Sequence, residues 1–247
     1  MFKVSPLRLR VFRTCRLRYK YQYVEKRQAR LRIADTAGSC VHNVLCEFFK
    51  LTPAERTAGR LLSDFDTRWE ALSPRYLAMP GVTELGEAAR TQLQRFAESQ
   101  DLIRDPFLIE AYFETHIAPD IVLFGRMDRV DEEDDRSLHV IDYKTSAAPD
   151  EVDADQLRLY ALIVQDNLER TVSKASFWYL DDSQVWTTEL EPHDNVRVRE
   201  EALALSLEMQ RVDEFPATIG PHCAHCPYLS LCERREEIAQ RRHAEGW

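Results

Sequence analysis

The 247-residue sequence lacks any apolar run that approaches the roughly 18 residues of a membrane-spanning helix. Its N-terminus is basic and has no continuous apolar core followed by a small-residue cleavage site, so it does not resemble a secretory signal. Internal repeats and low-complexity segments are absent, and 7 glycines are too few for a collagen-like chain. These absences predict a globular protein of the cytoplasm without a membrane partner.

The composition is that of a chain with a substantial hydrophobic core. Hydrophobic residues make up 44% of the sequence and charged residues 30%, which predicts one globular domain over residues 1–247. The formal net charge of −9 is unevenly distributed, because residues 1–32 contain eleven Lys or Arg and one acid, Glu25. Net charge alone therefore does not exclude a nucleic-acid partner.

The first hundred residues are expected to be mostly helical. Residues 5–33 predict mostly helix, and a second helix follows Gly38 with His42 in its early turns. Thr52-Pro53-Ala54-Glu55 has the form of a capping box, which predicts a new helix at Pro53. The stretch 51–104 is expected to be a helical insertion.

From Asp105 the pattern changes to short segments rich in β-branched and aromatic residues. Three consecutive strands are expected as a meander, followed by a helix and two more strands. A last helix is expected from about Asp194 to Val212, with Asp194 as its possible N-cap. The strands are expected at 107–117, 121–130, 138–145, 174–180 and 184–190, and the intervening helix at 151–168. The pattern predicts an α/β fold.

Two carboxylates and a lysine are expected to meet on one hairpin. The acidic connection from Asp131 to Ser137 centres the hairpin near residue 135, so Asp128 and Asp142 become cross-strand neighbours and Lys144 shares their face. Carboxylates this close repel unless a cation lies between them, and their oxygens suit Mg²⁺ or Mn²⁺. The alternative from the spacing alone is a solvated ion-pair ladder.

In these residues the chain resembles the RecB-like branch of the PD-(D/E)XK nuclease superfamily. The runs that carry the resemblance are GRMDRVD at 125–131, VIDYKTS at 140–146 and QLRLY at 156–160. The resemblance implies catalytic roles for Asp128, Asp142, Lys144, Gln156 and Tyr160. It also implies a restriction-endonuclease-like core, a central mixed sheet flanked by helices, over about 105–190.

Two further metal ligands are suggested by the same family. Gly38-Ser39-Cys40-Val41-His42 matches its Gly-x-x-x-His context, so the resemblance implies that His42 binds the metal with Asp128 and Asp142. Glu110 and Glu114 precede Asp128 on the first strand of the meander. Of these two, Glu114 is the one predicted as an accessory ligand.

Six cysteines are too few for a disulfide scaffold in a chain of this length, and their spacing suggests a metal. Cys223, Cys226 and Cys232 lie close together in a C-terminal region at 220–235, whereas Cys15 is far away in sequence. This arrangement resembles the iron–sulfur-cluster nucleases, such as the C-terminal nuclease domain of AddB and the CRISPR-associated RecB-like nucleases.

That resemblance implies a 4Fe-4S cluster held by the four cysteines, which would tie the two ends of the chain together. A structural zinc site, with His222 or His225 in place of one thiolate, is the alternative. Cys40 and Cys46 are expected to be ordinary buried residues.

The functional prediction is a metal-dependent deoxyribonuclease, an exonuclease for single-stranded DNA or DNA ends in repair. The basic N-terminal segment, with Tyr19, Tyr21 and Tyr23 between its charges, is expected to contact phosphates and unpaired bases. No Gly-x4-Gly-Lys-Ser/Thr phosphate loop occurs, so a helicase in trans would supply any unwinding, or the substrate is already single-stranded or has an end. The alternatives are a CRISPR-associated nuclease that trims DNA beside integration proteins, and a non-catalytic module that binds DNA or a partner.

Overall fold

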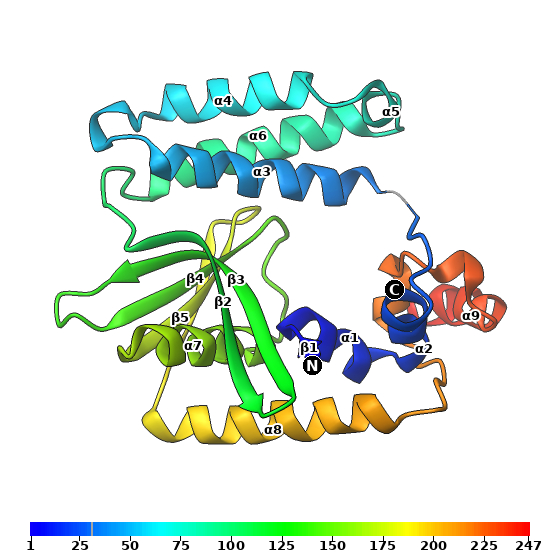
Figure 1. The fold of residues 1–247 in the computed structure, drawn as a ribbon. Coiled ribbons are helices and arrows are strands. Elements are labelled where there is room, and N and C mark those ends of the chain that lie inside the picture. The colour runs from blue at the N-terminus through cyan, green and yellow to red at the C-terminus, as the bar shows by residue number, and fades with distance from the viewer. Residues whose placement is uncertain (31) are drawn as a thin grey trace. The chain divides into compact units, whose positions relative to one another are not determined.

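The computed structural model describes residues 1–30 and 32–247, which pack as two compact units. The first unit contains Met1–Arg32, His116–Leu123 and Glu200–Trp247, and the second contains Ile33–Thr115 and Phe124–Arg199. Within the described residues, no helix is both long and apolar enough to cross a bilayer. Figure 1 follows the chain in colour from its N-terminus to its C-terminus. The single-domain assignment stays a prediction.

The first unit begins with a short strand that the sequence did not predict. Strand β1 (Phe2–Val4) pairs in parallel with Ile121–Leu123, the first residues of β3 (Ile121–Glu132). A strand of three residues shows too little alternation to be recognised from sequence.

The helix predicted over residues 5–33 is interrupted. Ser5 caps α1 (Pro6–Thr14), and its hydroxyl accepts a hydrogen bond from the Arg8 amide at 3.2 Å. The extended backbone of Cys15 separates α1 from α2 (Arg16–Tyr19), and a π-helical turn over Lys20–Val24 ends the helical segment. Position 31 of the predicted helix lies outside the described residues.

The tyrosines of this segment are not all free for stacking on bases, which corrects the prediction. Tyr19 is 2% exposed, and its hydroxyl accepts a hydrogen bond from Arg8 Nη2 at 3.0 Å. The Arg8 guanidinium also lies 4.7 Å from the Phe2 ring centroid and 5.1 Å from that of Tyr23. Arg8 and Tyr19 therefore belong to the packing of the first unit.

The C-terminal part of the chain is helical. Helix α8 (Pro192–Arg211) is followed by 3-10 turns at Pro221–His225 and Leu229–Leu231 and by α9 (Arg235–Glu245). Asp194 lies inside the first turn of α8, where its Oδ2 accepts a hydrogen bond from the Glu191 amide at 3.0 Å. It is therefore not the N-cap residue that the sequence suggested.

Four α-helices of the second unit precede its sheet in the described part of the chain. They are α3 (Ile33–Lys50), α4 (Ala58–Glu70), α5 (Pro74–Leu77) and α6 (Val82–Ser99). The capping box between Thr52 and Glu55 is present, but it closes only a 3-10 turn at Pro53–Glu55. The next α-helix starts later, because Thr57 caps α4 by accepting a hydrogen bond from the Arg60 amide.

A mixed sheet forms the centre of the second unit, as the sequence predicts. Strand β2 (Leu108–Ala118) pairs with β3, and β4 (Leu138–Lys144) pairs antiparallel with β3. Helix α7 (Asp155–Leu168) crosses to β5 (Val172–Tyr179), which is parallel to β4, and β6 (Gln184–Glu189) completes the sheet. Figure 1 shows α3, α4 and α6 as a layer on one side of these strands and α7 on the other side.

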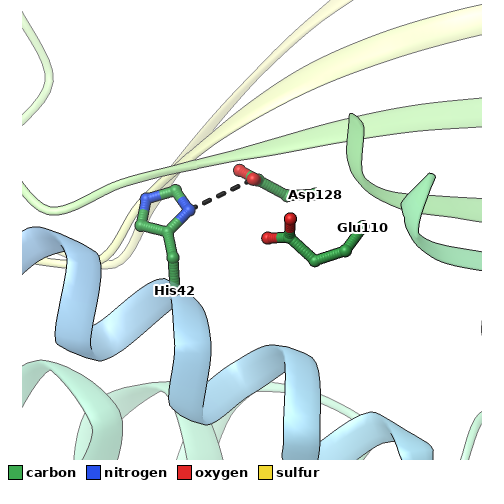
Figure 2. Close-up of side chains that lie close together, drawn as sticks. All are labelled: His42, Glu110 and Asp128. Carbon is green, nitrogen blue, oxygen red and sulfur yellow. Dashed lines mark hydrogen bonds and ion pairs between the residues drawn. The ribbon is translucent and has the colours of Figure 1, made fainter. Parts of the chain in front are cut away.

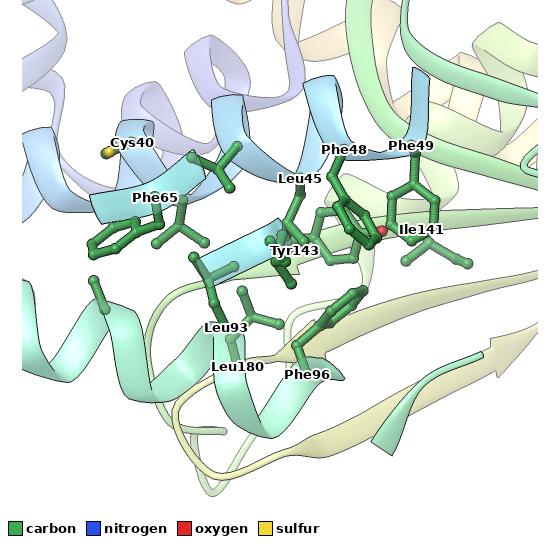
Figure 3. Close-up of a cluster of buried hydrophobic side chains, with 14 residues drawn as sticks. Cys40, Leu45, Phe48, Phe49, Phe65, Leu93, Phe96, Ile141, Tyr143 and Leu180 are labelled. Atoms are coloured by element: carbon green, nitrogen blue, oxygen red, sulfur yellow. The ribbon is translucent and has the colours of Figure 1, made fainter. Parts of the chain in front are cut away.

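The helical insertion shares a hydrophobic core with the sheet (Figure 3). The Phe96 ring of α6 packs edge-on against Tyr143 of β4, with centroids 5.7 Å apart, and Phe48 of α3 is fully buried. Burying a large apolar side chain contributes about 1.5–3 kcal/mol. The insertion is therefore part of the core that supports β4.

A buried histidine makes the stability of this sheet dependent on pH. The His139 side chain is 12% exposed, and its Nε2 lies 2.7 Å from Ser176 Oγ. Burial, together with the charge of nearby Lys174, lowers the pKa of His139 to about 4, against the opposing charges of Glu133 and Asp131. The unfolded chain therefore takes up this proton first as the pH falls, so folding stability is lost from about pH 6.5 down to about pH 4.

We expect the wild type to lose about 2 kcal/mol more stability than His139→Gln between pH 7 and pH 4.5. The glutamine amide retains a hydrogen-bonding group for Ser176 and does not titrate. Urea denaturation of both proteins at the two pH values measures the difference. Equal losses would show that the pKa of His139 is the same in the folded and the unfolded chain.

Candidate active site

The hairpin of β3 and β4 has the predicted register. Its ladder runs from Glu132 opposite Leu138 to Arg129 opposite Ile141, so Asp128 and Asp142 follow as the next pair. The ladder ends before that pair, and Asp128 Oδ2 accepts a hydrogen bond from the Tyr143 amide at 2.8 Å. This bond fixes the Asp128 carboxylate beside the end of β4.

Three ligand-type side chains converge at this point (Figure 2). His42 from α3, Glu110 from β2 and Asp128 from β3 each offer one ligand atom, and the three atoms lie within 4.8 Å of one another. His42 Nδ1 is 3.1 Å from Asp128 Oδ1. Burial and the negative charge of Asp128 raise the pKa of Glu110. An imidazole and two half-buried carboxylates are a donor set that suits a divalent cation, which would relieve their repulsion.

The sequence placed the accessory carboxylate at Glu114, whereas the cluster contains Glu110. Glu110 has a φ of 49°, which is uncommon for a residue other than glycine and interrupts the regular geometry of the strand. Backbone strain of this kind is often found at functional sites. Periodicity could not reveal it, because Glu110 and Glu114 are four positions apart and equivalent in an ideal strand.

The other predicted site residues form an adjoining hydrogen-bonded chain. Lys144 Nζ lies 2.5 Å from Asp142 Oδ2 and donates to Gln156 Oε1 at 3.2 Å. Gln156 Nε2 lies 3.1 Å from both Asp142 Oδ1 and the Tyr160 hydroxyl. The i, i+4 spacing of Gln156 and Tyr160 on α7 therefore places both beside the Asp142–Lys144 pair.

The pKa values of Asp142 and His42 are both raised in this site, for different reasons. Burial raises the pKa of Asp142 in spite of the attraction of Lys144, and the charge of Asp128 adds to that rise. For His42, burial alone would lower the pKa, but the hydrogen bond to Asp128 and the charges of Asp128 and Asp142 outweigh it, so the pKa is raised. The negative charge of Asp128 contributes to both shifts, and carboxylates crowded into a small volume favour a cation there.

Gly125 permits the close approach of Tyr160 to β3. A Cβ atom at position 125 would lie 2.8 Å from Tyr160 Cε1 and 3.1 Å from Ile163 Cδ1. We expect Gly125→Ala to displace the Tyr160 ring, to lower the free energy of unfolding by about 1–3 kcal/mol and to reduce nuclease activity. Chemical denaturation and cleavage rates measure the two effects.

The matched control is Gly59→Ala in α4, where a Cβ atom would meet nothing within 4 Å. Alanine favours helix over glycine by up to about 1 kcal/mol, so this variant should be as stable as the wild type or more stable. If both alanine variants behaved alike, the contact with Tyr160 would not matter.

The first unit contains a second cluster, a cavity lined by Cys15, Cys223, Cys226 and Cys232. Cys15 lies in the break between α1 and α2, and the other three lie in or beside the 3-10 turns near the C-terminus. Burial raises the pKa of Cys223 and Cys226, and the four cysteines are free thiols.

Cationic and imidazole groups also line this cavity. Arg18 lines it, and its Nε is buried without a hydrogen-bond partner. His222 lines it too, with Nε2 3.0 Å from the Thr218 carbonyl oxygen, whereas His225 is not among its lining residues. Four thiols and an arginine whose buried Nε lacks a hydrogen-bond partner suit a negatively charged thiolate-bound centre. Cys40 and Cys46 lie in α3 of the second unit, as expected for residues outside the cavity.

Comparisons with known proteins identify the family of this chain. Curated proteins give no match, and among solved structures 20 chains match. One of them, titled "Crystal structure of SSO0001", is 15% identical over 94% of this chain and 86% of that chain, with a TM-score of 0.46. A family model described as the PD-(D/E)XK nuclease superfamily matches residues 3–233. Nearly the whole chain, including the mixed sheet and both clusters, thus falls within the match, and the protein belongs to the PD-(D/E)XK nuclease superfamily.

Proposed function

We propose that the protein is a Mg²⁺- or Mn²⁺-dependent deoxyribonuclease that acts on single-stranded DNA or DNA ends, as an exonuclease in DNA repair. The observation that carries the proposal is the convergence of His42, Glu110 and Asp128 beside the Asp142–Lys144 pair. Membership of a nuclease superfamily supports the reaction class.

The donor set indicates which residues would hold the ion. His42, Glu110, Asp128 and Asp142 supply one imidazole and three carboxylates, and hard oxygen ligands of this kind suit Mg²⁺ and Mn²⁺. A bound divalent ion polarises a phosphate oxygen and lowers the pKa of water.

The chain's own groups then orient the reaction. Lys144 Nζ, held between Asp142 and Gln156, is placed to position the attacking water and to stabilise negative charge that develops on the phosphate. Its side chain is 26% exposed, so it is reachable from solvent. Gln156 bonds to Asp142, Lys144 and Tyr160 at once, which fixes their mutual orientation.

End-labelled single-stranded and duplex DNA, incubated with purified protein and Mg²⁺, Mn²⁺ or EDTA, tests the proposal. We expect cleavage with either metal, a preference for single strands or ends, and none in EDTA. The product ladder gives the polarity. Cleavage in EDTA, or no cleavage of any DNA with either metal, would contradict the proposed function.

We further propose that the four-cysteine cavity holds a 4Fe-4S cluster. The arrangement of Cys15, Cys223, Cys226 and Cys232 supports it, and Arg18 would offset part of the charge of four thiolates in a buried environment. Anaerobically purified protein should be brown and contain iron and sulfide. Colourless protein with one equivalent of zinc would establish the alternative structural site.

The proposed cellular compartment and partners rest on the sequence alone. A reducing cytoplasm would keep the cysteines available as metal ligands. The predicted partners are a helicase that acts in trans and CRISPR integration proteins. Co-purification from cells with a tagged copy of the chain tests both partners.

A further inference from the structure

Two aromatic rings lie together on the strands that lead to the cluster. Tyr112 of β2 and Phe124 of β3 have ring centroids 6.0 Å apart, at an interplanar angle of 42°. Tyr112 is 47% exposed, and Phe124 is partly exposed. Large exposed aromatic side chains of this kind are candidates for contact with a ligand.

A basic side chain lies between this pair and the cluster. Arg126 follows Phe124 by two residues on β3, precedes Asp128 by two, and its side chain is 64% exposed. Its Nη1 is 3.6 Å from Glu110 Oε2, so the guanidinium adjoins the carboxylate of the cluster. One end of the guanidinium is near Glu110, and much of the rest faces solvent.

We propose that Tyr112, Phe124 and Arg126 form a binding surface for single-stranded DNA that leads into the active site. The inference rests on the proposed nuclease function, and it names the residues that select an unpaired strand. Arg126 would bind the phosphate next to the one that is cleaved, and the two rings would stack against bases farther along the strand.

Geometry and chemistry both favour an unpaired strand. Alternate residues of a β-strand are roughly 6.6 Å apart, so Phe124, Arg126 and Asp128 present contacts at regular steps along β3. An aromatic ring stacks on the face of a base, which is covered by neighbouring pairs in a duplex but accessible in a single strand. The rings therefore add affinity only when the bases are unpaired.

Fluorescence anisotropy with labelled oligothymidylate and with a labelled hairpin duplex tests the inference, in EDTA so that no DNA is cut. We expect Tyr112→Ala and Phe124→Ala to weaken oligothymidylate binding about 10-fold each, and Tyr112→Phe to retain wild-type affinity. Duplex binding should change less than twofold. Arg126→Gln should lower the slope of log affinity against log salt by about one phosphate contact.

Phe107→Ala is the matched control. Phe107 is 41% exposed and has the Arg170 guanidinium 4.8 Å from its ring centroid, so it too is an exposed aromatic beside an arginine. Arg170 pairs with Glu132 at the far end of β3, away from Phe124. This variant should bind oligothymidylate as the wild type does.

The outcomes separate this inference from the proposed function. Wild-type oligothymidylate affinity in Tyr112→Ala and Phe124→Ala, or an equal loss in Phe107→Ala, would overturn the binding surface while metal-dependent cleavage stood. A wild type that neither binds nor cuts DNA would overturn both. Far-ultraviolet circular dichroism and thermal unfolding of each variant show whether a loss reflects the surface or the fold.

Discussion

Replacing Lys144 with alanine should reduce the rate of DNA cleavage roughly 1,000-fold with the fold intact. The substitution removes the ammonium group 2.5 Å from Asp142 Oδ2 and the donor to Gln156. Because burial already raises the pKa of Asp142, loss of the neighbouring positive charge raises it further and favours the protonated form. The variant should thus lose the positive charge that stabilises the reacting phosphate. Its Asp142 should also be protonated more often, which weakens its binding to a cation.

Single-turnover cleavage at saturating metal measures this effect, and Lys174→Ala is the control. Lys174 lies on the neighbouring strand, pairs with Glu133 at 3.1 Å, and its side chain is 30% exposed against 26% for Lys144. Its removal should leave the cleavage rate within about threefold of the wild type. A Lys144→Ala enzyme that retained more than a tenth of the wild-type rate would show that Lys144 has no direct part in the chemistry.

The hairpin could be predicted from sequence because its signals are local. An acidic turn flanked by two apolar strands fixes the register, and the register places Asp128 opposite Asp142. Gln156 and Tyr160 were implied by the family resemblance, and their i, i+4 spacing adds only that one face of α7 presents both. The register of a hairpin and the shared face of a helix each depend on a few residues that are close in sequence, so a local pattern is enough to predict them.

Features that depend on backbone distortion could not be predicted. Glu110 has a positive φ and lies in the cluster, and no alternation pattern distinguishes it from Glu114. The capping box at Thr52 is likewise present in the structure, but it precedes only a 3-10 turn. Helix α4 has Thr57 as its N-cap. Local signals identify candidate termini, whereas tertiary packing chooses between them.

The basic N-terminal segment shows a different limit. Interleaved Arg and Tyr residues predict a nucleic-acid surface, but the Arg8 guanidinium lies against the rings of Phe2, Tyr19 and Tyr23. Composition cannot separate cation–π packing within a protein from stacking on bases, because both use the same residue types. By contrast, no sequence pattern marks Tyr112 or Arg126, although both are exposed and Arg126 adjoins Glu110 of the cluster.

The second large effect is expected when a cysteine of the cavity is replaced. Cys15→Ala should abolish iron binding and lower the free energy of unfolding by about 4 kcal/mol, because a centre that joins Cys15 to Cys232 closes a loop of more than 200 residues. Iron and sulfide analysis, the visible spectrum and anaerobic urea denaturation measure these changes. Cys223→Ala, Cys226→Ala and Cys232→Ala should behave alike, since each removes one ligand of the proposed cluster.

Cys40→Ala is the matched control, since Cys40 is 4% exposed and Cys15 is 8% exposed, so both substitutions remove a buried sulfur. Cys40 packs in the core of the second unit against residues of α3, α4 and α6, and its loss should cost about 1 kcal/mol without any change in iron content. Equal stabilities of Cys15→Ala and Cys40→Ala, with iron retained in both, would remove Cys15 from the ligand set. The expected difference arises from the metal alone, because the apolar area that the two sulfurs bury is similar.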